Sequence, residues 1–445
     1  MKSLRILAIA IAASFGANVG APCATLRVPS EYRTINAGLD AAAPGDTVLV
    51  APGTYSDFEI RTLVGQSSAC AFLKAGVVLK SEGGSSATSL DRQGVETSAT
   101  DYTVVGWFAD GAVMEGFRIT GNPPEVEAVL VQGLPPTPPM VTFRDCRFEG
   151  LVSEGMGALR ARYSSAALYD CQFVDCHGDA SATVRQSEAH MIVENCVFEN
   201  CSPTALRCEG DSFVAETLVV RNSIFRNNSS TLSGGAIIAS YYDGGAVIEG
   251  CLFEGNQAYL SGGAIVAYAA TSFVLRDNVF VNNRVEGHIY ATGGGMYLAN
   301  GAGPLCVIER NTFYGCHQGY FDGGSALYGN GGGPTLRDNV FVLSTGAPAV
   351  SLTSAPVDEG CNLFWNNLAG DAVGFTPDST DVFADPQFCN AAVSDFTVSS
   401  ISPCAPGNSP YCDQIGALGV GCGLVSIEPM SWGELKARFR GNAEE

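Results

Sequence analysis

The sequence is poor in charge, and above all in positive charge. Of its 445 residues 16% are charged, and 24 Lys and Arg face 45 Asp and Glu, which leaves a net charge of −21. Nucleic acids and anionic membrane surfaces are bound by clustered cations, so both are disfavoured as partners. A hydrophobic content of 46% also excludes an intrinsically disordered chain.

Histidines and long apolar runs are scarce as well. The four histidines, His177, His190, His288 and His317, show neither the H-x-H nor the H-E-x-x-H spacing, so we expect no transition-metal site. Beyond the first residues no apolar run is long enough to cross a bilayer, so we expect no membrane span.

The N-terminal residues have the composition of an export signal. Lys2 and Arg5 are followed by an apolar stretch, residues 6–15, that is too short to span a bilayer, and then by small residues. We therefore predict a signal peptide at residues 1–24. The protein would be secreted by a bacterium, or held on its cell surface, where cysteines normally form disulfides.

What the sequence has in abundance is an internal repeat. Segments such as EGCLFEGN (249–256) and RDNVFVNN (276–283) recur along most of the chain. A repeat sustained over so many copies indicates a solenoid, in which each copy packs on its neighbours. An aromatic or apolar anchor, 23 to 33 residues from the next, marks the copies: Ile119, Phe148, Phe173, Phe198, Phe225, Phe253, Phe280, Phe313, Phe341 and Phe364.

The local pattern of the repeat indicates which solenoid it forms. Around each anchor, core and variable residues alternate as in a strand, and an apolar residue five positions earlier belongs to a second short strand. The pair between them, such as Glu249-Gly250, is typical of a tight turn. Since no helical spacing occurs between the strands, we predict an all-β fold, a single-stranded parallel β-helix with regular coils over residues 101–367.

The residue just before the tight turn provides a test of this register. Its charge mostly alternates from copy to copy, and equivalent residues of stacked coils lie about 4.8 Å apart. Alternating signs turn repulsion along such a row into pairing. We predict one stack on the outer surface, formed by Glu115, Arg144, Tyr169, Glu194, Arg221, Glu249, Arg276, Glu309 and Arg337.

Another position of the repeat accepts only small side chains. It holds cysteine in four early copies and asparagine in four later ones, and a position after the anchor varies in the same way. A slot that accepts Cys, Asn or Ser indicates a small buried side chain and not a nucleophile. The residues of the first slot are Cys146, Cys171, Cys196, Cys251, Asn278, Asn311, Asn339 and Asn362.

An open β-helix exposes strand edges, so both of its ends need closure. In residues 30–46, Tyr32, Ile35 and Leu39 have helical spacing, which predicts an amphipathic helix that caps the first coil. We place this cap and the first coils at residues 25–100.

The C-terminal part breaks the period. Residues 384–422 are dense in Pro, Gly and Cys, and we predict a disulfide-rich C-terminal cap over 368–425, followed by a tail at 426–445 with a short helical pattern. The bridges are expected among four cysteines, with the pairing left open: Cys389, Cys404, Cys412 and Cys422.

The stretch at residues 25–55 and the C-x-F-x-x-N coils resemble the right-handed parallel β-helix proteins of the pectate-lyase-like superfamily. The resemblance covers about residues 25–422 and implies a right-handed helix. It also implies either a lyase, with a calcium cluster of aspartates, or a glycoside hydrolase. The motifs of both are missing: no adjacent Asp-Asp occurs, and His288 lies in GHIY and not in GHG. We therefore expect no catalytic residue and no cofactor, with calcium only in the case of a lyase.

Three tyrosines stand out from the scaffold. Tyr259, Tyr290 and Tyr320 each precede a Gly-Gly step by three residues, and Asp322 and His288 lie beside them. A row of aromatic rings on one loop face would grip an extended polysaccharide by stacking. The alternative, that the tyrosines pack over loop backbone, is the commoner case.

Together these features predict a monomeric, secreted or cell-surface repeat protein that binds carbohydrate or acts in adhesion without catalysis. Its partner would be a polysaccharide or a cell-surface glycan. The alternative is a polysaccharide lyase or glycoside hydrolase with an unrecognised active site.

Overall fold

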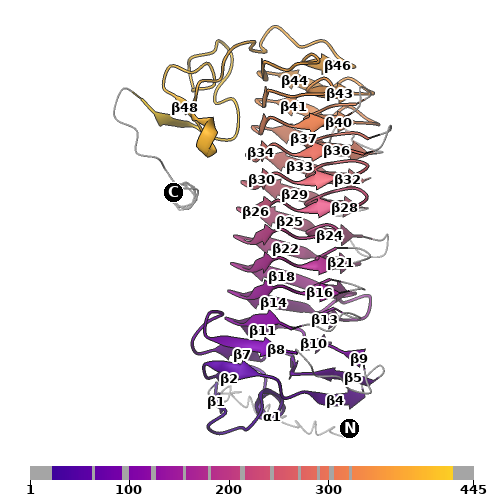
Figure 1. The fold of residues 1–445 in the computed structure, drawn as a ribbon, viewed down its shortest axis with the longest axis vertical. Helices are drawn as coiled ribbons and strands as arrows, with labels where there is room; N and C mark the ends of the chain where they lie inside the picture. Colours follow the sequence, from indigo (N-terminus) through magenta and orange to yellow (C-terminus); the bar gives the residue numbers. More distant parts are fainter. Residues whose placement is uncertain are drawn as a thin grey trace, which may run out of the picture.

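The chain folds into a long solenoid of stacked coils, seen here in a computed structural model (Figure 1). Residues 1–22 of the predicted signal peptide, the tail at 426–445 and the loops that hold His288, Tyr290, Tyr320 and Asp322 lie outside the described residues. The structure describes residues 23–62, 66–92, 100–121, 127–153, 157–178, 182–210, 216–240, 245–268, 272–287, 291–299, 305–319 and 323–423.

Sheet 1, the first wall of the solenoid, is entirely parallel, and each coil adds one strand to it. Its strands are β1 (Thr25–Val28), β2 (Thr47–Val50), β7 (Val78–Ser81), β11 (Ala112–Glu115), β14 (Met140–Arg144), β18 (Ser165–Tyr169), β22 (Met191–Glu194), β25 (Leu218–Arg221), β29 (Ala246–Glu249), β33 (Phe273–Arg276), β37 (Cys306–Glu309), β41 (Thr335–Arg337) and β44 (Asp358–Gly360).

Sheet 2 follows sheet 1 within each coil, after a tight turn. At the turn between β29 and β30, Gly250 has a φ of +64°, in the left-handed region that glycine adopts readily. The strands of sheet 2 are β3 (Gly53–Tyr55), β8 (Thr88–Asp91), β12 (Arg118–Thr120), β15 (Arg147–Glu149), β19 (Gln172–Val174), β23 (Val197–Glu199), β26 (Ile224–Arg226), β30 (Leu252–Glu254), β34 (Val279–Val281), β38 (Thr312–Tyr314), β42 (Val340–Val342) and β45 (Leu363–Trp365).

Sheet 3 closes each coil, and the chain then returns to sheet 1 of the next. The strands of sheet 3 are β6 (Ala71–Phe72), β10 (Val104–Trp107), β13 (Val129–Gln132), β17 (Leu159–Arg162), β21 (Val184–Ser187), β24 (Leu206–Glu209), β28 (Ile237–Ser240), β32 (Ile265–Tyr268), β36 (Met296–Ala299), β40 (Leu327–Gly329), β43 (Val350–Leu352) and β46 (Ala372–Val373).

Smaller sheets occupy the connections and the C-terminal segment. They are formed by β16 (Val152–Ser153) with β20 (His177–Gly178); by β27 (Ser229–Ser230), β31 (Gln257–Ala258), β35 (Arg284–Val285) and β39 (His317–Gln318); by β4 (Glu59–Thr62), β5 (Gln66–Ala69) and β9 (Thr100–Asp101); and by β47 (Phe388–Asn390), β48 (Asp395–Ser399) and β49 (Val420–Cys422).

The predicted anchors form the centre of the core. From Phe148 to Phe364 the rings of successive coils stack with centroids 4.4 to 5.3 Å apart, and Ile119 pairs with Phe148 in register. All of these side chains are almost fully buried. The prediction that each repeat is one coil is therefore confirmed.

The small slot beside the anchors is also buried, as predicted, and it has an internal hydrogen-bond ladder. Oδ1 of Asn311 accepts from the backbone N–H of Asn278 at 3.1 Å and from its Nδ2 at 3.0 Å. The same pattern links Asn311 to Asn339 of the following coil. The cysteines that fill the slot earlier are buried free thiols, so they are part of the core and not nucleophiles.

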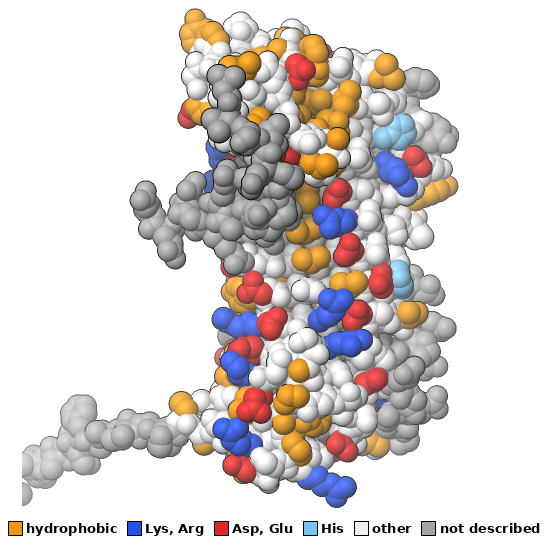
Figure 2. Space-filling view, turned by 60° about the vertical axis from the view of Figure 1, so that its left-hand side comes forward, with side chains coloured by type: hydrophobic (Ala, Val, Ile, Leu, Met, Phe, Trp, Pro, Cys, Tyr) orange, Lys and Arg blue, Asp and Glu red, His pale blue; other side chains and the backbone are white. Residues whose placement is uncertain are grey.

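The charged stack on sheet 1 is confirmed along its whole length. Every predicted member lies in register with the next, from Glu115 to Arg337. Glu249 pairs with Arg276 at 3.0 Å and Glu194 with Arg221 at 3.8 Å. Basic and acidic side chains also alternate over the face that is turned forward in Figure 2.

The predicted N-terminal helix is present but shorter than the segment that suggested it. Helix α1 (Ile35–Ala41) is capped at its N-terminus by Thr34, whose side chain accepts a hydrogen bond from the N–H of Ala37. Ile35 and Leu39 are buried, and the helix lies against β1, β2 and β6 at the N-terminal end of the solenoid (Figure 1). Tyr32 precedes the helix and is partly buried against the core.

The predicted C-terminal cap has two parts. Around residues 380–383 it lies on the last coil, where Val382 pairs with Leu363 and the ring of Phe383 stacks on Phe364, whereas the C-terminal segment, residues 388–422, lies against the outer face of sheet 2 (Figure 1). Phe396 and Leu418 pack there on Leu252, Val279 and Val281. The physical reason is that the outward positions of sheet 2 are apolar in these coils, so covering them removes that surface from water.

Two disulfides hold this segment, Cys361–Cys412 and Cys389–Cys422. The expectation that Cys404 is bridged is wrong, because Cys404 is a free thiol in the core of the segment, where burial raises its pKa to about 12. Its expected place is taken by Cys361, which belongs to the last coil. In the part of the chain that the structure describes, no helix is long and apolar enough to cross a membrane.

Candidate functional site

The outer face of sheet 3 carries two rows of side chains that run along the solenoid, because alternate residues of each strand point outward. One row changes from arginine to apolar and aromatic side chains: Arg160, Arg185, Arg207, Ile238, Val266, Tyr297 and Tyr328. The row beside it contains Arg162, Ser187, Glu209, Ser240 and Tyr268.

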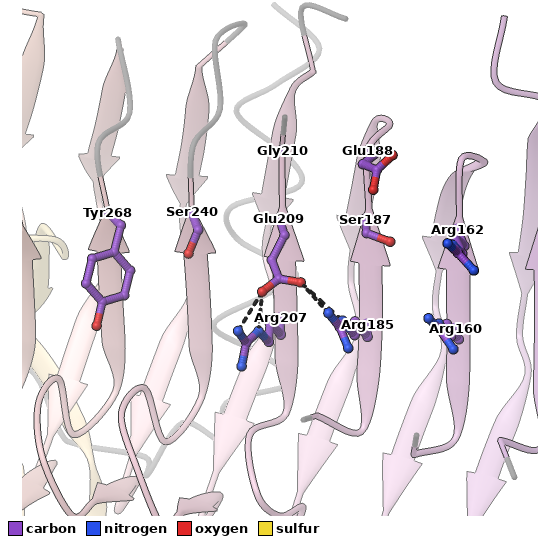
Figure 3. A pocket seen from close by; sticks show the side chains of 10 residues that line it. All are labelled: Arg160, Arg162, Arg185, Ser187, Glu188, Arg207, Glu209, Gly210, Ser240 and Tyr268. Carbon is purple, nitrogen blue, oxygen red and sulfur yellow. Dashed lines mark hydrogen bonds and ion pairs between the residues drawn. The ribbon is translucent and has the colours of Figure 1, made fainter. Parts of the chain in front are cut away.

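A pocket of about 590 Å³ lies over this face between β17 and β32 (Figure 3). Four arginines and two glutamates line it, although the chain as a whole has a net charge of −21. The remaining lining residues are small or hydroxyl-bearing, apart from one tyrosine. The residues are Arg160, Arg162, Arg185, Ser187, Glu188, Arg207, Glu209, Gly210, Ser240 and Tyr268.

Glu209 organises two of the arginines. Arg185 donates from Nε and Nη2 to one oxygen of Glu209, at 3.1 and 2.7 Å, and Arg207 donates from Nε to the other at 2.7 Å. Burial raises the pKa of Glu209, but the hydrogen bonds from Arg185 and the charge of Arg207 outweigh it and leave that pKa below its ordinary value. Glu209 is thus ionised, and it neutralises one of the two neighbouring cations.

The positive charges of Arg160 and Arg162 are less neutralised by neighbouring carboxylates. Among the described residues no ion pair joins Arg160 or Arg162 to a carboxylate, and Nε of Arg160 is buried without a hydrogen-bond partner there. Arg162 is exposed, and the Cζ atom of its guanidinium lies 5.1 Å from the ring centroid of Tyr163. Arg160 acts on the buried Glu127, whose pKa is raised by burial and lowered in part by this arginine. The pocket therefore presents an excess of positive charge.

A row of tyrosines continues this surface toward the C-terminal end. The ring centroids of Tyr268 and Tyr297 are 6.2 Å apart, and those of Tyr297 and Tyr328 are 5.5 Å apart. The hydroxyl of Tyr297 accepts a hydrogen bond from Asn330 at 2.9 Å, and burial raises the pKa of Tyr297. Because Tyr268 also lines the arginine pocket, the charged and aromatic parts form one surface.

Sequence patterns did not single out these residues, although a signal was present. LRAR (159–162), VRQS (184–187) and LRCE (206–209), from consecutive repeats, each have an arginine as their second residue. The repeat is most regular in the strands of sheets 1 and 2, and the spacing from those strands to sheet 3 varies. Arg160 and Arg185 both lie 12 residues after their anchors, but Arg207 lies 9 after Phe198, so the outward residues of sheet 3 do not keep one fixed position in the repeat.

Of the tyrosines that sequence analysis proposed, the structure describes Tyr259. It lines a second pocket of about 680 Å³, on the connection that leads from sheet 2 to sheet 3. Its ring packs against the backbone of Gly287, where an added Cβ would lie 2.3 Å from the ring carbon Cδ2. Tyr259 thus packs over loop backbone and also borders a pocket, and the binding role of the row stays a prediction.

Three carboxylates at the C-terminal end of sheet 1 are the metal-like cluster that the described residues contain. One oxygen each of Glu359, Asp378 and Asp381 lies within 4.8 Å of the others. Burial, and then the contact with Asp381, raise the pKa of Glu359 to about 8. Calcium takes six to eight oxygen ligands, but oxygens of Glu359 and Asp381 already accept hydrogen bonds from Asn362. The cluster is several coils away from the arginines, so we assign it no part in their chemistry.

Comparisons with solved structures find proteins of low similarity. The A-module of a mannuronan C-5 epimerase from Azotobacter vinelandii is 14% identical with a TM-score of 0.35, covering 79% of this chain and 95% of that one. A PL6-family alginate lyase, AlyGC, in a mutant form is 14% identical with a TM-score of 0.41, covering 91% of this chain and 59% of that one. At these scores neither similarity carries an argument about function.

The family assignment depends on the sequence and the fold. No curated protein matches the sequence. A family model described as "Right handed beta helix region" matches residues 109–259 and, in an overlapping match, residues 157–341, which together are more than half of the chain. The stacked parallel sheets agree with that description. The chain belongs to the right-handed parallel β-helix family.

Proposed function

We propose that this protein binds an acidic polysaccharide along the outer face of sheet 3. The observation that carries the proposal is the row formed by Arg160, Arg185 and Arg207, in register on three consecutive strands. Clustered cations repel one another unless they bind an anion. The cluster is also unusual in a chain whose net charge is −21. The neighbouring Glu209 neutralises only part of it.

The chemistry of the row fits carboxylate groups on a linear polymer. Guanidinium groups bind carboxylates through paired, charge-assisted hydrogen bonds. Adjacent arginines are separated by about one coil rise of 4.8 Å, so anionic groups repeated along an extended chain would meet them in turn. Sugar rings further along would stack on Tyr268 and Tyr297.

The proposal includes export, a monomeric state and the domain boundaries expected from the sequence. Disulfides persist in oxidising compartments outside the cytosol, and Cys361–Cys412 and Cys389–Cys422 support secretion or a cell-surface location. A polysaccharide or a cell-surface glycan would be available in that location.

Binding without catalysis is favoured over a polysaccharide lyase. A lyase needs a cation to neutralise the uronate carboxylate, which the arginines would supply, and also a base to remove a proton from the sugar ring. Glu209 is held by Arg185 and Arg207 with a lowered pKa, so it is a weak base. Glu188 and Tyr268 are the remaining described acid–base groups of the pocket, and they keep the lyase as the second candidate.

The experiment compares acidic polysaccharides, such as polygalacturonate and alginate, with neutral ones in a binding assay. The same mixtures are assayed for unsaturated products by ultraviolet absorbance, with and without calcium. We expect binding of acidic chains that weakens with added salt, and no product. Equal binding of neutral and acidic chains contradicts the proposal, whereas product release that requires Tyr268 or Glu188 favours the lyase.

A further inference from the structure

The second pocket, on the connection between sheets 2 and 3, has a different chemistry from the arginine pocket. Its wall is formed by the ends and neighbours of β20, β27, β31 and β35. Its lining includes Ser202, Ser229, Thr231, Gln257, Tyr259 and Glu286. It has a volume of about 680 Å³, enough for more than one sugar ring.

Tyr259 forms a step in the surface of the solenoid. The equivalent position of the preceding coil is Thr231, a much smaller residue, so the phenol ring rises above that coil. The ring is 45% exposed and is supported by the backbone of Gly287 in the following coil. An aromatic ring that is fixed on one side and borders a pocket on the other is a platform for the apolar face of a sugar.

The polar groups around this platform suit sugar hydroxyls. Oε1 of Gln257 accepts a hydrogen bond from Nη2 of Arg284 at 2.8 Å. The amide oxygen is thus occupied, and Nε2 of Gln257 is the group that would donate to a sugar hydroxyl. The hydroxyl of Ser202 is hydrogen-bonded to Nδ1 of His177 at 2.8 Å. Hydroxyls donate and accept, so such a wall pairs with ligands that do the same.

The charge of the pocket disfavours anionic ligands. Glu286 is its charged residue among those described, and no Lys or Arg is part of the described lining. Arg284 lies nearby, but its Nε is 3.9 Å from Glu286 and its Nη2 is engaged by Gln257. Because Arg284 is paired with Glu286 and Gln257, the described lining offers an acidic sugar no uncommitted cation, so the pocket favours an uncharged sugar.

We propose that this pocket is a second glycan site and that it binds an uncharged sugar residue. The two pockets occupy the same coils, since Ser202, Thr231 and Tyr259 come shortly before β24, β28 and β32 of the arginine surface. The sugar is either a free neutral oligosaccharide or a neutral branch of an acidic chain. The site stands on its own residues and does not depend on the acidic-chain proposal.

The test measures binding of neutral galacto-, arabino-, xylo-, manno- and gluco-oligosaccharides to the full chain by calorimetry and ligand-observed NMR. We expect at least one class to bind, with affinity reduced about tenfold by Tyr259→Ala and largely retained by Tyr259→Phe. Tyr411→Ala is the matched control, because Tyr411 is a highly exposed tyrosine outside the pocket. Thermal unfolding of each variant checks the fold.

A further arm separates the two sources of the sugar. Pectin that carries neutral side chains is compared with unbranched polygalacturonate. If Tyr259→Ala weakens binding of the branched polymer alone, the ligand is a neutral branch. If the substitution changes the binding of neither polymer but weakens that of a neutral oligosaccharide, the ligand is a free oligosaccharide.

The proposal is overturned if none of the neutral oligosaccharides binds, or if Tyr259→Ala binds them as the wild type does. The acidic-chain proposal is tested separately with an Arg160→Gln/Arg162→Gln variant, and it fails if that variant binds acidic oligosaccharide as the wild type does. That variant should keep its affinity for neutral oligosaccharides.

Discussion

Arg185 on β21 donates two hydrogen bonds to a single carboxylate oxygen of Glu209 on the next strand, β24, at 3.1 and 2.7 Å. Glu209 also holds Arg207, so one carboxylate orders two cations on the surface of sheet 3. A fixed guanidinium loses less conformational freedom when it binds an anion than a mobile one does. This arrangement therefore prepares the surface for an acidic ligand while keeping part of its charge free.

Removing the charge of Glu209 should strengthen binding of acidic polysaccharide. In Glu209→Gln an amide oxygen still accepts from the arginines, but the pocket gains one net positive charge, and we expect about fivefold tighter binding at low salt. Calorimetry with polygalacturonate measures it. The control is Glu199→Gln on sheet 2, where a partly exposed carboxylate faces Arg226 away from the pocket. Weaker binding of polygalacturonate by Glu209→Gln would contradict the view that Glu209 reduces the positive charge available to the ligand.

The asparagine ladder should make a large contribution to stability. Asn311→Ala removes the acceptor for the N–H of Asn278 and leaves buried polar groups unpaired, which costs about 2–3 kcal/mol. We expect the denaturation midpoint in urea to fall accordingly. Asn390→Ala, at an exposed position of the C-terminal segment, is the control and should change the midpoint little. An unchanged midpoint for Asn311→Ala would argue against the ladder.

The repeat made most of the fold predictable. Phe253 and its equivalents recur with a strand-like alternation, and the alternating charges from Glu115 to Arg337 are compatible with a single register of the stacked coils. These features are local to each repeat, so the same physics acts on every copy.

The arginine surface and the disulfide pairing were harder to predict because both depend on non-local contacts. Arg185 lies 12 residues after its anchor Phe173 but Arg207 only 9 after Phe198, so only the pairing of β21 with β24 places these two arginines in one row. Cys361 reaches Cys412 because the C-terminal segment folds back on the apolar face of sheet 2, and no local pattern encodes that direction.

The disulfide pairing can be tested directly. Peptide mapping without reduction should find Cys361–Cys412 and Cys389–Cys422, with Cys404 as a free thiol. Cys361→Ser should lower the free energy of unfolding by about 2–4 kcal/mol, whereas Cys404→Ser should leave both bridges intact. A bridge that includes Cys404 would contradict the pairing.

The carboxylate cluster should make stability depend on pH. The pKa of Glu359 is raised to about 8 by burial and by Asp381, so the folded state keeps a proton that the unfolded chain loses near its ordinary value of 4.5. The contribution of Glu359 to stability is therefore complete at low pH and is lost as pH rises toward about 8. Melting temperatures across this range should decline less for Glu359→Gln than for the wild type. The control, Glu82→Gln at the N-terminal end, should follow the wild type, and a parallel decline for both variants would refute this account.

The most direct test of the account is the affinity of acidic oligosaccharide for Arg160→Gln/Arg162→Gln, measured by calorimetry at low and high salt beside the wild type. Arg221→Gln, which removes an exposed arginine from sheet 1, is the control. The account predicts that the double variant binds at least about tenfold more weakly, that the wild type loses affinity as salt is added, and that Arg221→Gln behaves as the wild type. Equal affinity of the double variant and the wild type would contradict it.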